Sequence, residues 1–261
     1  MSFPNVIYGD YGDEKRAQST KIGSMSLGVV LILSDGREYQ HGKASTAAAL
    51  SAGYLCCGSV TVDSGTSVEF GLVAATAAVG ATSVVVTLAA GTAVTTDKFA
   101  EGVLVTASST GTGIGLEYKI KSNGSAAAGS ACTISLYEED SIQIAIAGGT
   151  TRVGLRENPL NNVVVVPAST GFPGKLIGVP QTAVSAGFYT WFQTKGYSPG
   201  YVSSGTAMVT GDLCNASTGY AGAFGVVEAG TALTSRRQMV AGQVVGVANT
   251  TGFTVIDLQI S

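Results

Sequence analysis

Hydrophobic and polar residues alternate in short runs along much of the chain, and this is the pattern of β-strands. In the clearest example, residues 117–122, every second residue is charged: Glu117, Lys119 and Lys121. A strand with a period of two turns one set of side chains to solvent and the other to the core. We therefore predict a half-exposed strand in this segment.

Further strands are predicted from apolar runs bounded by turn residues. The run at 27–33 is followed by Ser-Asp-Gly at 34–36, which favours a tight turn and so predicts a hairpin. Residues 44–52 are rich in helix-forming alanine, but serine, threonine and a following glycine keep any helix short. The other predicted strands lie at 83–88, 102–106, 133–137, 142–147 and 163–166. Frequent short strands without helical periodicity predict an all-β fold of one or two small antiparallel barrels or sandwiches.

The distribution of charge predicts an N-terminal arm. Six of the 31 charged residues fall within the first 21 positions, a segment without sustained periodicity. We expect residues 1–21 to form an extended arm that lies across a neighbouring subunit, with an ordinary flexible terminus as the alternative. Its candidate partner-binding residues are Tyr8, Tyr11, Lys15 and Arg16. Residues 22–178 are expected to form one or more β-rich domains, and residues 179–261 a C-terminal barrel-like domain.

Two segments of the chain echo each other. Residues 49–58 and 183–192 both contain Ser-Ala-Gly followed by an aromatic residue. Chance similarity in a chain rich in alanine, glycine and serine is the favoured explanation, whereas a duplication would make this a two-barrel protein.

The composition predicts a largely neutral surface. Charged residues make up 12% of the chain, about half of the roughly 25% usual in soluble proteins. A net charge of −3 opposes nucleic acid as a partner, because phosphate binding depends on clustered lysine and arginine. The longest apolar runs, 28–33 and 163–168, are far shorter than the ~20 residues of a membrane helix, so no membrane partner is expected. The N-terminus lacks the pattern of a signal peptide, which predicts synthesis in the cytoplasm.

Candidate catalytic and metal-binding residues are few. His41, the only histidine, lies in a hairpin-like region and is expected in a surface loop. Glu138, Glu139 and Asp140 are consecutive on a predicted turn, where carboxylates diverge into solvent, so neither a glycosidase pair nor a calcium site is expected. The GTGIG segment at 111–115 is similar to a dinucleotide fingerprint, but a predicted strand follows it where a helix is required. We expect no catalytic residue, metal ligand or cofactor, and no enzymatic activity.

The cysteines and the tryptophan are expected in the core. Adjacent Cys56 and Cys57 would point to opposite faces of a strand, and the four cysteines show no disulfide spacing, so buried free thiols are expected. The other two cysteines are Cys132 and Cys214. Trp191 lies in the aromatic segment 188–192, for which core packing is favoured and stacking on a sugar ring is the alternative.

Four stretches resemble structural proteins of tailed-bacteriophage heads, in particular the β-rich decoration, or cement, proteins bound outside the capsid. They are GTGIGLEYKIKSN at 111–123, ENPLNNVVVVP at 157–167, GVPQTAVSAGFYTWFQTKGY at 178–197 and AGQVVGVANTTGFTVIDLQI at 241–260. The resemblance implies a homotrimer on the exterior of the virion that binds the major capsid protein and stabilises the head by bridging capsid subunits.

The resemblance leaves other virion roles open, because the chain is about twice the size of the smallest decoration proteins. The alternatives are a tail-tube protein or a head-fibre or tail-fibre adhesin that binds glycans, with Trp191 and nearby tyrosines as the stacking surface. A hydrolase built on Glu138 and Asp140 is the least supported alternative.

Overall fold

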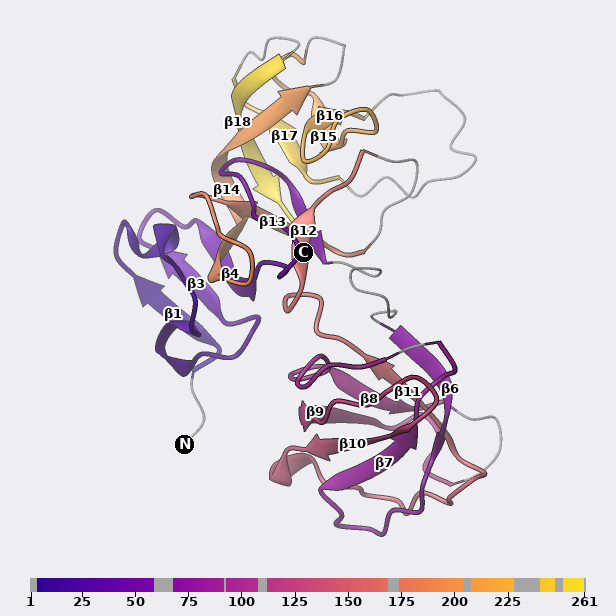
Figure 1. The fold of residues 1–261 in the computed structure, drawn as a ribbon. Helices are drawn as coiled ribbons and strands as arrows, with labels where there is room; N and C mark the ends of the chain where they lie inside the picture. Colours follow the sequence, from indigo (N-terminus) through magenta and orange to yellow (C-terminus); the bar gives the residue numbers. More distant parts are fainter. Residues whose placement is uncertain are drawn as a thin grey trace. The chain divides into compact units, whose positions relative to one another are not determined.

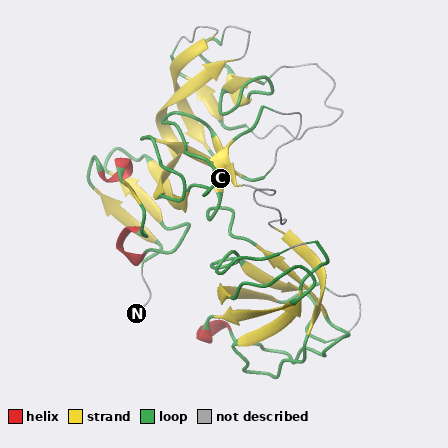
Figure 2. Cartoon of the chain, in the orientation of Figure 1, coloured by secondary structure: helices red, strands yellow, loops and turns green. Residues whose placement is uncertain are grey.

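The protein is all-β, as the alternating pattern predicts (Figures 1 and 2). The computed structural model describes residues 4–58, 68–91, 93–107, 112–168, 174–203, 208–227, 240–246 and 251–260. In these ranges the only helices are three single 3-10 turns: η1 (Asp13–Lys15), η2 (Ile22–Ser24) and η3 (Glu138–Asp140). No helix of the described residues has the length and apolar character needed to cross a membrane.

The chain forms two compact units, and their boundaries differ from the predicted ones. Unit 1 comprises Met1–Ser59 and Pro159–Ser261, and unit 2 comprises Val60–Asn158. The predicted boundary after residue 178 falls inside β13 (Leu176–Pro180), a strand of unit 1 that pairs with β14 (Tyr189–Ser203). Strand pairing joins the two ends of the chain in unit 1, and a division into consecutive segments could not represent this.

Unit 2 is a closed barrel of six antiparallel strands. Their order around the barrel is β10-β7-β6-β11-β8-β9, with β9 pairing back to β10. The strands are β6 (Val68–Ala74), β7 (Ser83–Thr87), β8 (Val103–Thr106), β9 (Glu117–Asn123), β10 (Ala131–Leu136) and β11 (Arg152–Arg156). Closure pairs both edges of every strand, so the barrel has no open edge to pair with another chain.

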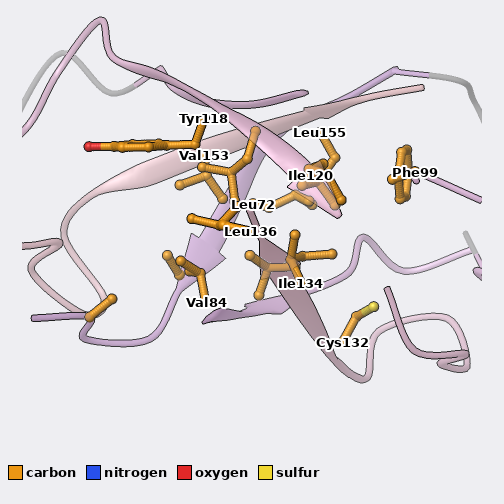
Figure 3. Close-up of a cluster of buried hydrophobic side chains, with 14 of the residues drawn as sticks. Leu72, Val84, Phe99, Tyr118, Ile120, Cys132, Ile134, Leu136, Val153 and Leu155 are labelled. Carbon is orange, nitrogen blue, oxygen red and sulfur yellow. The ribbon is translucent and has the colours of Figure 1, made fainter. Parts of the chain in front are cut away.

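One continuous core fills unit 2 (Figure 3). Tyr118 and Ile120 of β9 point into it together with Ile134 of β10, and each of these side chains is at most 1% exposed. The charged alternate positions of β9 face solvent. The half-exposed strand predicted at 117–122 is therefore confirmed.

Unit 1 contains a second closed ring. Five strands, β14-β16-β15-β17-β18, pair in that order, and β18 pairs back to β14. Besides β14 they are β15 (Leu213–Ala216), β16 (Phe224–Val226), β17 (Gly242–Val244) and β18 (Thr251–Gln259). We call this ring the five-stranded barrel.

The first half of β14 belongs to a sheet that continues from the five-stranded barrel. There β14 pairs with β4 (Glu38–Lys43), β4 pairs with β3 (Val30–Leu33), and the hairpin predicted at 34–36 joins these two strands. β1 (Val6–Gly9) pairs with β3, and β2 (Ala17–Gln18) pairs with β14. β13 also pairs with β5 (Cys56–Gly58), which pairs with β12 (Val163–Val165).

The N-terminal segment is part of the unit 1 sheet, whereas we expected an extended arm. β1 runs parallel to β3, and the Thr190 hydroxyl of β14 donates to the Arg16 carbonyl over 2.9 Å. Glu14, in the turn between β1 and β2, is only 2% exposed, and its Oε2 accepts from the Gly12 N–H over 2.6 Å. These contacts attach the N-terminal segment to unit 1 of its own chain.

Two predicted elements are absent from segments that the structure describes in full. Residues 44–52 form no helix, because Ala44 and Leu50 are buried in β-bridges to Val163 and Val184. Residues 142–147 form no strand, and only Ile146 makes an isolated bridge. In both segments, long-range bridges replace the local structure that composition favours.

The cysteines are free and buried, as predicted. Cys56 packs in one hydrophobic cluster of unit 1 and Cys57 in another, so β5 is covered on both faces. The two echoing segments both lie in unit 1 and pair with each other through Leu50 and Val184. They therefore do not mark one copy per barrel.

Candidate functional site

An exposed apolar surface covers part of the five-stranded barrel. Eight of the sixteen exposed large hydrophobic side chains of the described residues lie from residue 197 onward. The outward positions of β14 and β18 are in register, so that Pro199 faces Val255 and Tyr201 faces Phe253. Val245 lies beside Val255, to whose carbonyl it donates a hydrogen bond of 2.9 Å. We define the apolar face as Tyr54, Pro199, Tyr201, Val245, Phe253 and Val255.

The aromatic side chains of the apolar face hold one another in place. The Tyr54 and Tyr201 rings stack with centroids 4.7 Å apart, and the Phe253 ring is tilted against Tyr201 at 5.5 Å. Phe253 lies over Gly53, where a Cβ atom would come within 2.5 Å of its ring. Tyr201 donates its N–H to the Gly53 carbonyl over 2.8 Å, which ties the loop that carries Tyr54 to the barrel. The aromatic side chains of the apolar face are therefore preorganised.

The surroundings of the apolar face carry little charge. Among the described residues from 197 to 260, only Asp212 and Asp257 are charged. Phe253 remains 60% exposed and Val255 44% exposed. Contiguous exposed apolar surface on a soluble protein usually marks a site of interaction, and the cores of protein interfaces are depleted in charge.

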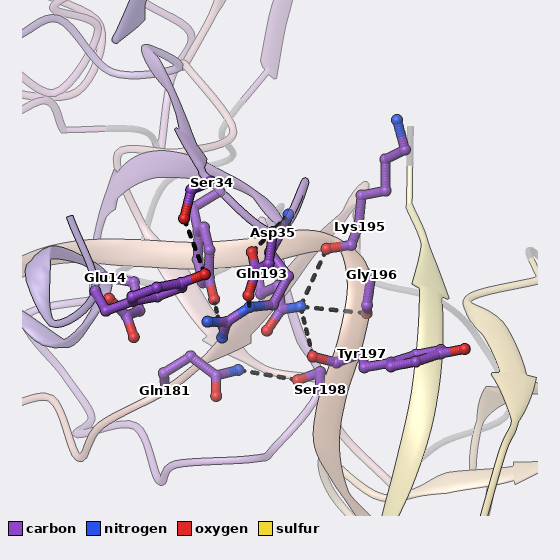
Figure 4. Close-up of polar contacts among 12 residues, drawn as sticks. Glu14, Ser34, Asp35, Gln181, Gln193, Lys195, Gly196, Tyr197 and Ser198 are labelled. Carbon is purple, nitrogen blue, oxygen red and sulfur yellow. Dashed lines mark hydrogen bonds and ion pairs between the residues drawn. The ribbon is translucent and has the colours of Figure 1, made fainter. Parts of the chain in front are cut away.

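Next to the apolar face, a buried glutamine fixes a bulge in β14 (Figure 4). Gln193 is fully buried, and its Nε2 donates to the carbonyl oxygens of Lys195, Gly196 and Tyr197 over 3.0, 3.2 and 3.0 Å. Gly196 adopts a φ of 84°, which L residues with a side chain rarely adopt. At the bulge, β14 passes from the sheet in which it pairs with β4 into the five-stranded barrel. The bulge also fixes the outward direction of Tyr197.

Arg37 is held beside this bulge, close to Gly196 and hydrogen-bonded to Asp35, both of which Figure 4 labels. Arg37 Nε donates to Asp35 Oδ2 over 2.7 Å, and Nη1 donates to the Tyr39 hydroxyl over 2.8 Å. The guanidinium also lies over the Tyr11 ring, 6.0 Å from its centroid. Burial raises the pKa of Tyr39, so its hydroxyl stays protonated at neutral pH. Arg37 is therefore fixed in orientation.

A groove with a volume of ≈ 1010 Å³ opens between the 34–36 turn, the middle of β14 and the end of β18. Its charged lining comes from Asp35, Arg37 and Glu38 on one side and from Lys195 and Asp257 on the other. Within β14, residues Thr194 to Tyr197 line the groove, and the apolar face begins at Pro199. The groove and the apolar face are thus successive sites on one pair of strands.

The predicted partner-binding residues are all exposed, but they do not gather at one point. Tyr8 is 83% exposed on β1, and Lys15 is exposed in η1. Tyr11, 64% exposed, joins the arginine cluster, because its hydroxyl accepts from the Ser34 hydroxyl over 2.8 Å. Arg16 is engaged in an ion pair with Asp13 at 2.6 Å. Of the four, only Tyr11 borders the groove region.

His41 is completely buried, so the expectation of a surface loop is wrong. It lies on β4, and its ring packs against those of Tyr189 and Trp191 at 5.7 and 5.3 Å. Nδ1 lies 3.2 Å from the Ser26 carbonyl and so carries the proton, while Nε2 has no partner among the described residues. Burial lowers the pKa of His41 and keeps the ring neutral.

Trp191 is in the core, as the favoured interpretation predicted. Only 2% of it is exposed, and it belongs to the cluster that includes Tyr39 and Leu31. The alternative, a sugar-stacking surface on Trp191, is therefore wrong.

The acidic turn is solvated as predicted. Glu138 and Glu139 are exposed, and Asp140 accepts a hydrogen bond from the Lys119 N–H. Among the described residues, no three histidine, cysteine or acidic side chains gather as metal ligands would. In the GTGIG segment, Gly111 lies outside the described residues, and the remainder leads into strand β9 as predicted.

The residues of the apolar face and the groove were not predicted from the sequence. Their only sequence signal is the alternation at 253–259, where Phe253 and Val255 alternate with Ile256 and Leu258. The set with Phe253 and Val255 also contains the polar Asp257 and Gln259, which indicates that this set faces solvent. The structure agrees, because Ile256 and Leu258 of the other set are fully buried.

Comparison with known proteins adds no relative. No family model, no curated protein and no solved structure matches the chain.

Proposed function

We propose that this chain is a decoration protein that binds the outer surface of a bacteriophage head and stabilises it by bridging major capsid subunits. The observation that carries the proposal is the apolar face of unit 1, a preorganised and uncharged platform. The sequence resemblance to phage head proteins supports the same role, and the partner that it implies is the major capsid protein. The homotrimer and the location outside the virion belong to the proposal on the same basis.

The apolar face has the chemistry of a permanent contact. Tyrosine and phenylalanine bury a large area with few rotatable bonds, so ordering them on binding costs little entropy. The stacked rings of Tyr54 and Tyr201 have already lost much of that freedom. Tyrosine is also enriched among the residues that dominate binding energy at protein interfaces. A repeated contact of this kind would stabilise the assembled shell, because it favours the assembled state over free subunits.

The exposed N-terminal tyrosines offer a second contact. Tyr8 on β1 and Tyr11 in the following turn are 83% and 64% exposed. In this proposal unit 1 touches one capsid subunit with its apolar face and a neighbouring subunit with these side chains. Because β1 and β2 belong to the sheet, point variants test this contact better than a deletion of residues 1–21.

The test is binding to phage heads that lack this protein. Wild-type protein should cosediment with the heads and raise their melting temperature. Val255→Lys places a charge in the middle of the apolar face and should weaken binding by at least tenfold, which corresponds to about 1.4 kcal/mol. Val85→Lys is the matched control, because Val85 is an outward strand valine of unit 2 with 40% exposure against 44% for Val255.

Wild-type protein that neither binds the heads nor raises their melting temperature would refute the proposal. If wild-type protein binds and both lysine variants bind equally well, the apolar face is not the contact.

A further inference from the structure

The groove beside the apolar face carries charged groups that neutralise one another. Arg37 forms a hydrogen-bonded ion pair with Asp35, and Lys195 Nζ donates to Glu38 Oε1 over 2.8 Å. Among the described residues that line the groove, these two pairs leave Asp257 as the only charge outside them. An ionic ligand would therefore gain little net Coulomb attraction in the groove.

The same groups suit a ligand with many hydroxyls. Each hydroxyl donates one hydrogen bond and accepts others, so it is matched by a lining in which carboxylates alternate with cationic donors. Hydrogen bonds to ionised groups are also stronger than those between neutral groups. Gln40, Thr194 and Gln259 add neutral donors and acceptors to the lining.

An exposed aromatic ring stands at the border of the groove. Tyr197 is 62% exposed and lies directly across the ribbon from Asp257. The C–H face of a sugar ring packs on such an aromatic face, while its hydroxyls reach the polar side chains around it. The bulge held by Gln193 fixes this ring next to the carboxylate.

We propose that the groove binds a neutral oligosaccharide, with a sugar ring stacked on Tyr197 and its hydroxyls hydrogen-bonded to Asp257, Lys195 and the Asp35–Arg37 pair. The volume of ≈ 1010 Å³ is at the upper end of the roughly 300–1,000 Å³ of small-molecule sites, so it accommodates several linked sugars. This activity goes beyond capsid attachment and does not depend on it.

The test uses the purified full chain on an array of defined bacterial and mucin-type oligosaccharides, neutral and acidic, followed by titration of the best neutral probe. Tyr197→Ala should weaken binding by at least tenfold, and Tyr197→Phe should bind within about threefold of wild type because the ring is kept. Tyr220→Ala is the matched control, since Tyr220 is 52% exposed on the same barrel but does not line the groove. Far-UV circular dichroism checks that each variant folds.

The proposal is overturned if wild-type protein binds no neutral oligosaccharide, if it binds acidic glycans alone, or if Tyr197→Ala binds as tightly as Tyr220→Ala. Because no phage head is present in the assay, these outcomes are separate from success or failure of the capsid proposal.

Discussion

Unit 1 and unit 2 bury their apolar surface in different ways. Unit 2 forms from one continuous segment, closes six antiparallel strands into a barrel and fills it with a single core. Unit 1 joins both ends of the chain, contains three hydrophobic clusters and leaves an aromatic platform in solvent. Unit 2 is built around one filled core, whereas unit 1 also carries the apolar face, a surface that another molecule can cover.

The two units also differ in net charge. Unit 2 has nine acidic and five basic residues, a net charge of −4, whereas unit 1 has eight acidic and nine basic residues, a net charge of +1. A charged surface keeps a domain soluble and apart from others, and a weakly charged one permits close contact. The comparison therefore favours unit 1 as the unit that attaches in the proposed function.

The largest expected effect tests whether the units are independent. Ile134→Ala empties part of the unit 2 core and should destabilise unit 2 by about 2–5 kcal/mol. Trp191, the only tryptophan, lies in unit 1, so the urea midpoint measured by its fluorescence should be the same as in wild type. Hydrogen-exchange mass spectrometry on peptides of unit 2 should show the loss.

Ile256→Ala in the five-stranded barrel is the matched variant, because both isoleucines are fully buried. It should lower the urea midpoint measured by Trp191 fluorescence and leave the hydrogen exchange of unit 2 unchanged. An equal shift of the Trp191 transition by Ile134→Ala would show that the units fold as one.

The next effect concerns how closely strands approach in the five-stranded barrel. A Cβ atom on Gly242 would lie 2.2 Å from the Asp257 carbonyl oxygen, so Gly242→Ala must push β17 away from β18. We expect a loss of about 1–3 kcal/mol in urea unfolding followed by Trp191 fluorescence. Gly219→Ala is the control, because no atom lies within 4 Å of its added methyl group, and it should stay within about 0.5 kcal/mol of wild type. Equal stability of the two variants would contradict the close approach.

The smallest effect is the pH dependence that His41 gives to the stability of unit 1. Burial lowers the pKa of His41 below its ordinary value of 6.5, the Ser26 carbonyl opposes this shift, and the nearby Lys21 charge adds to it. The unfolded chain therefore takes up this proton at higher pH than the folded chain. The contribution of neutral His41 is complete above pH 6.5 and is lost as the pH falls through the lower folded pKa.

Unit 1 should consequently lose stability between pH 7.5 and pH 5, measured as the urea midpoint of Trp191 fluorescence. His41→Gln should reduce that dependence. A variant with the same pH dependence as wild type would show that other groups cause it.

Local patterns predicted much of the fold. The charged alternation in β9 and the turn residues at 34–36 act over a few residues, and both predictions are confirmed. The pairing of β2 with β14 joins residues more than 150 positions apart, and the pairs β14–β18 and β6–β11 join residues more than 45 positions apart. No local periodicity encodes such pairings, so the division into units was not predictable from it.

The sites were less predictable than the fold. Phe253 is as apolar as the buried Ile256, so its residue type alone does not show that it stays exposed in the folded barrel. His41 looked like a loop residue because a turn precedes its strand, but the rings of Tyr189 and Trp191 cover it. The partners that decide the position of these side chains come from distant strands.

The most direct test of the account is a hydrogen-exchange footprint of the chain on phage heads compared with the free chain. The account predicts new protection in peptides that cover residues 197–203 and 251–260, and unchanged exchange in residues 68–158. Protection confined to residues 68–158, with the β14–β18 ribbon unchanged, would contradict attachment through the apolar face.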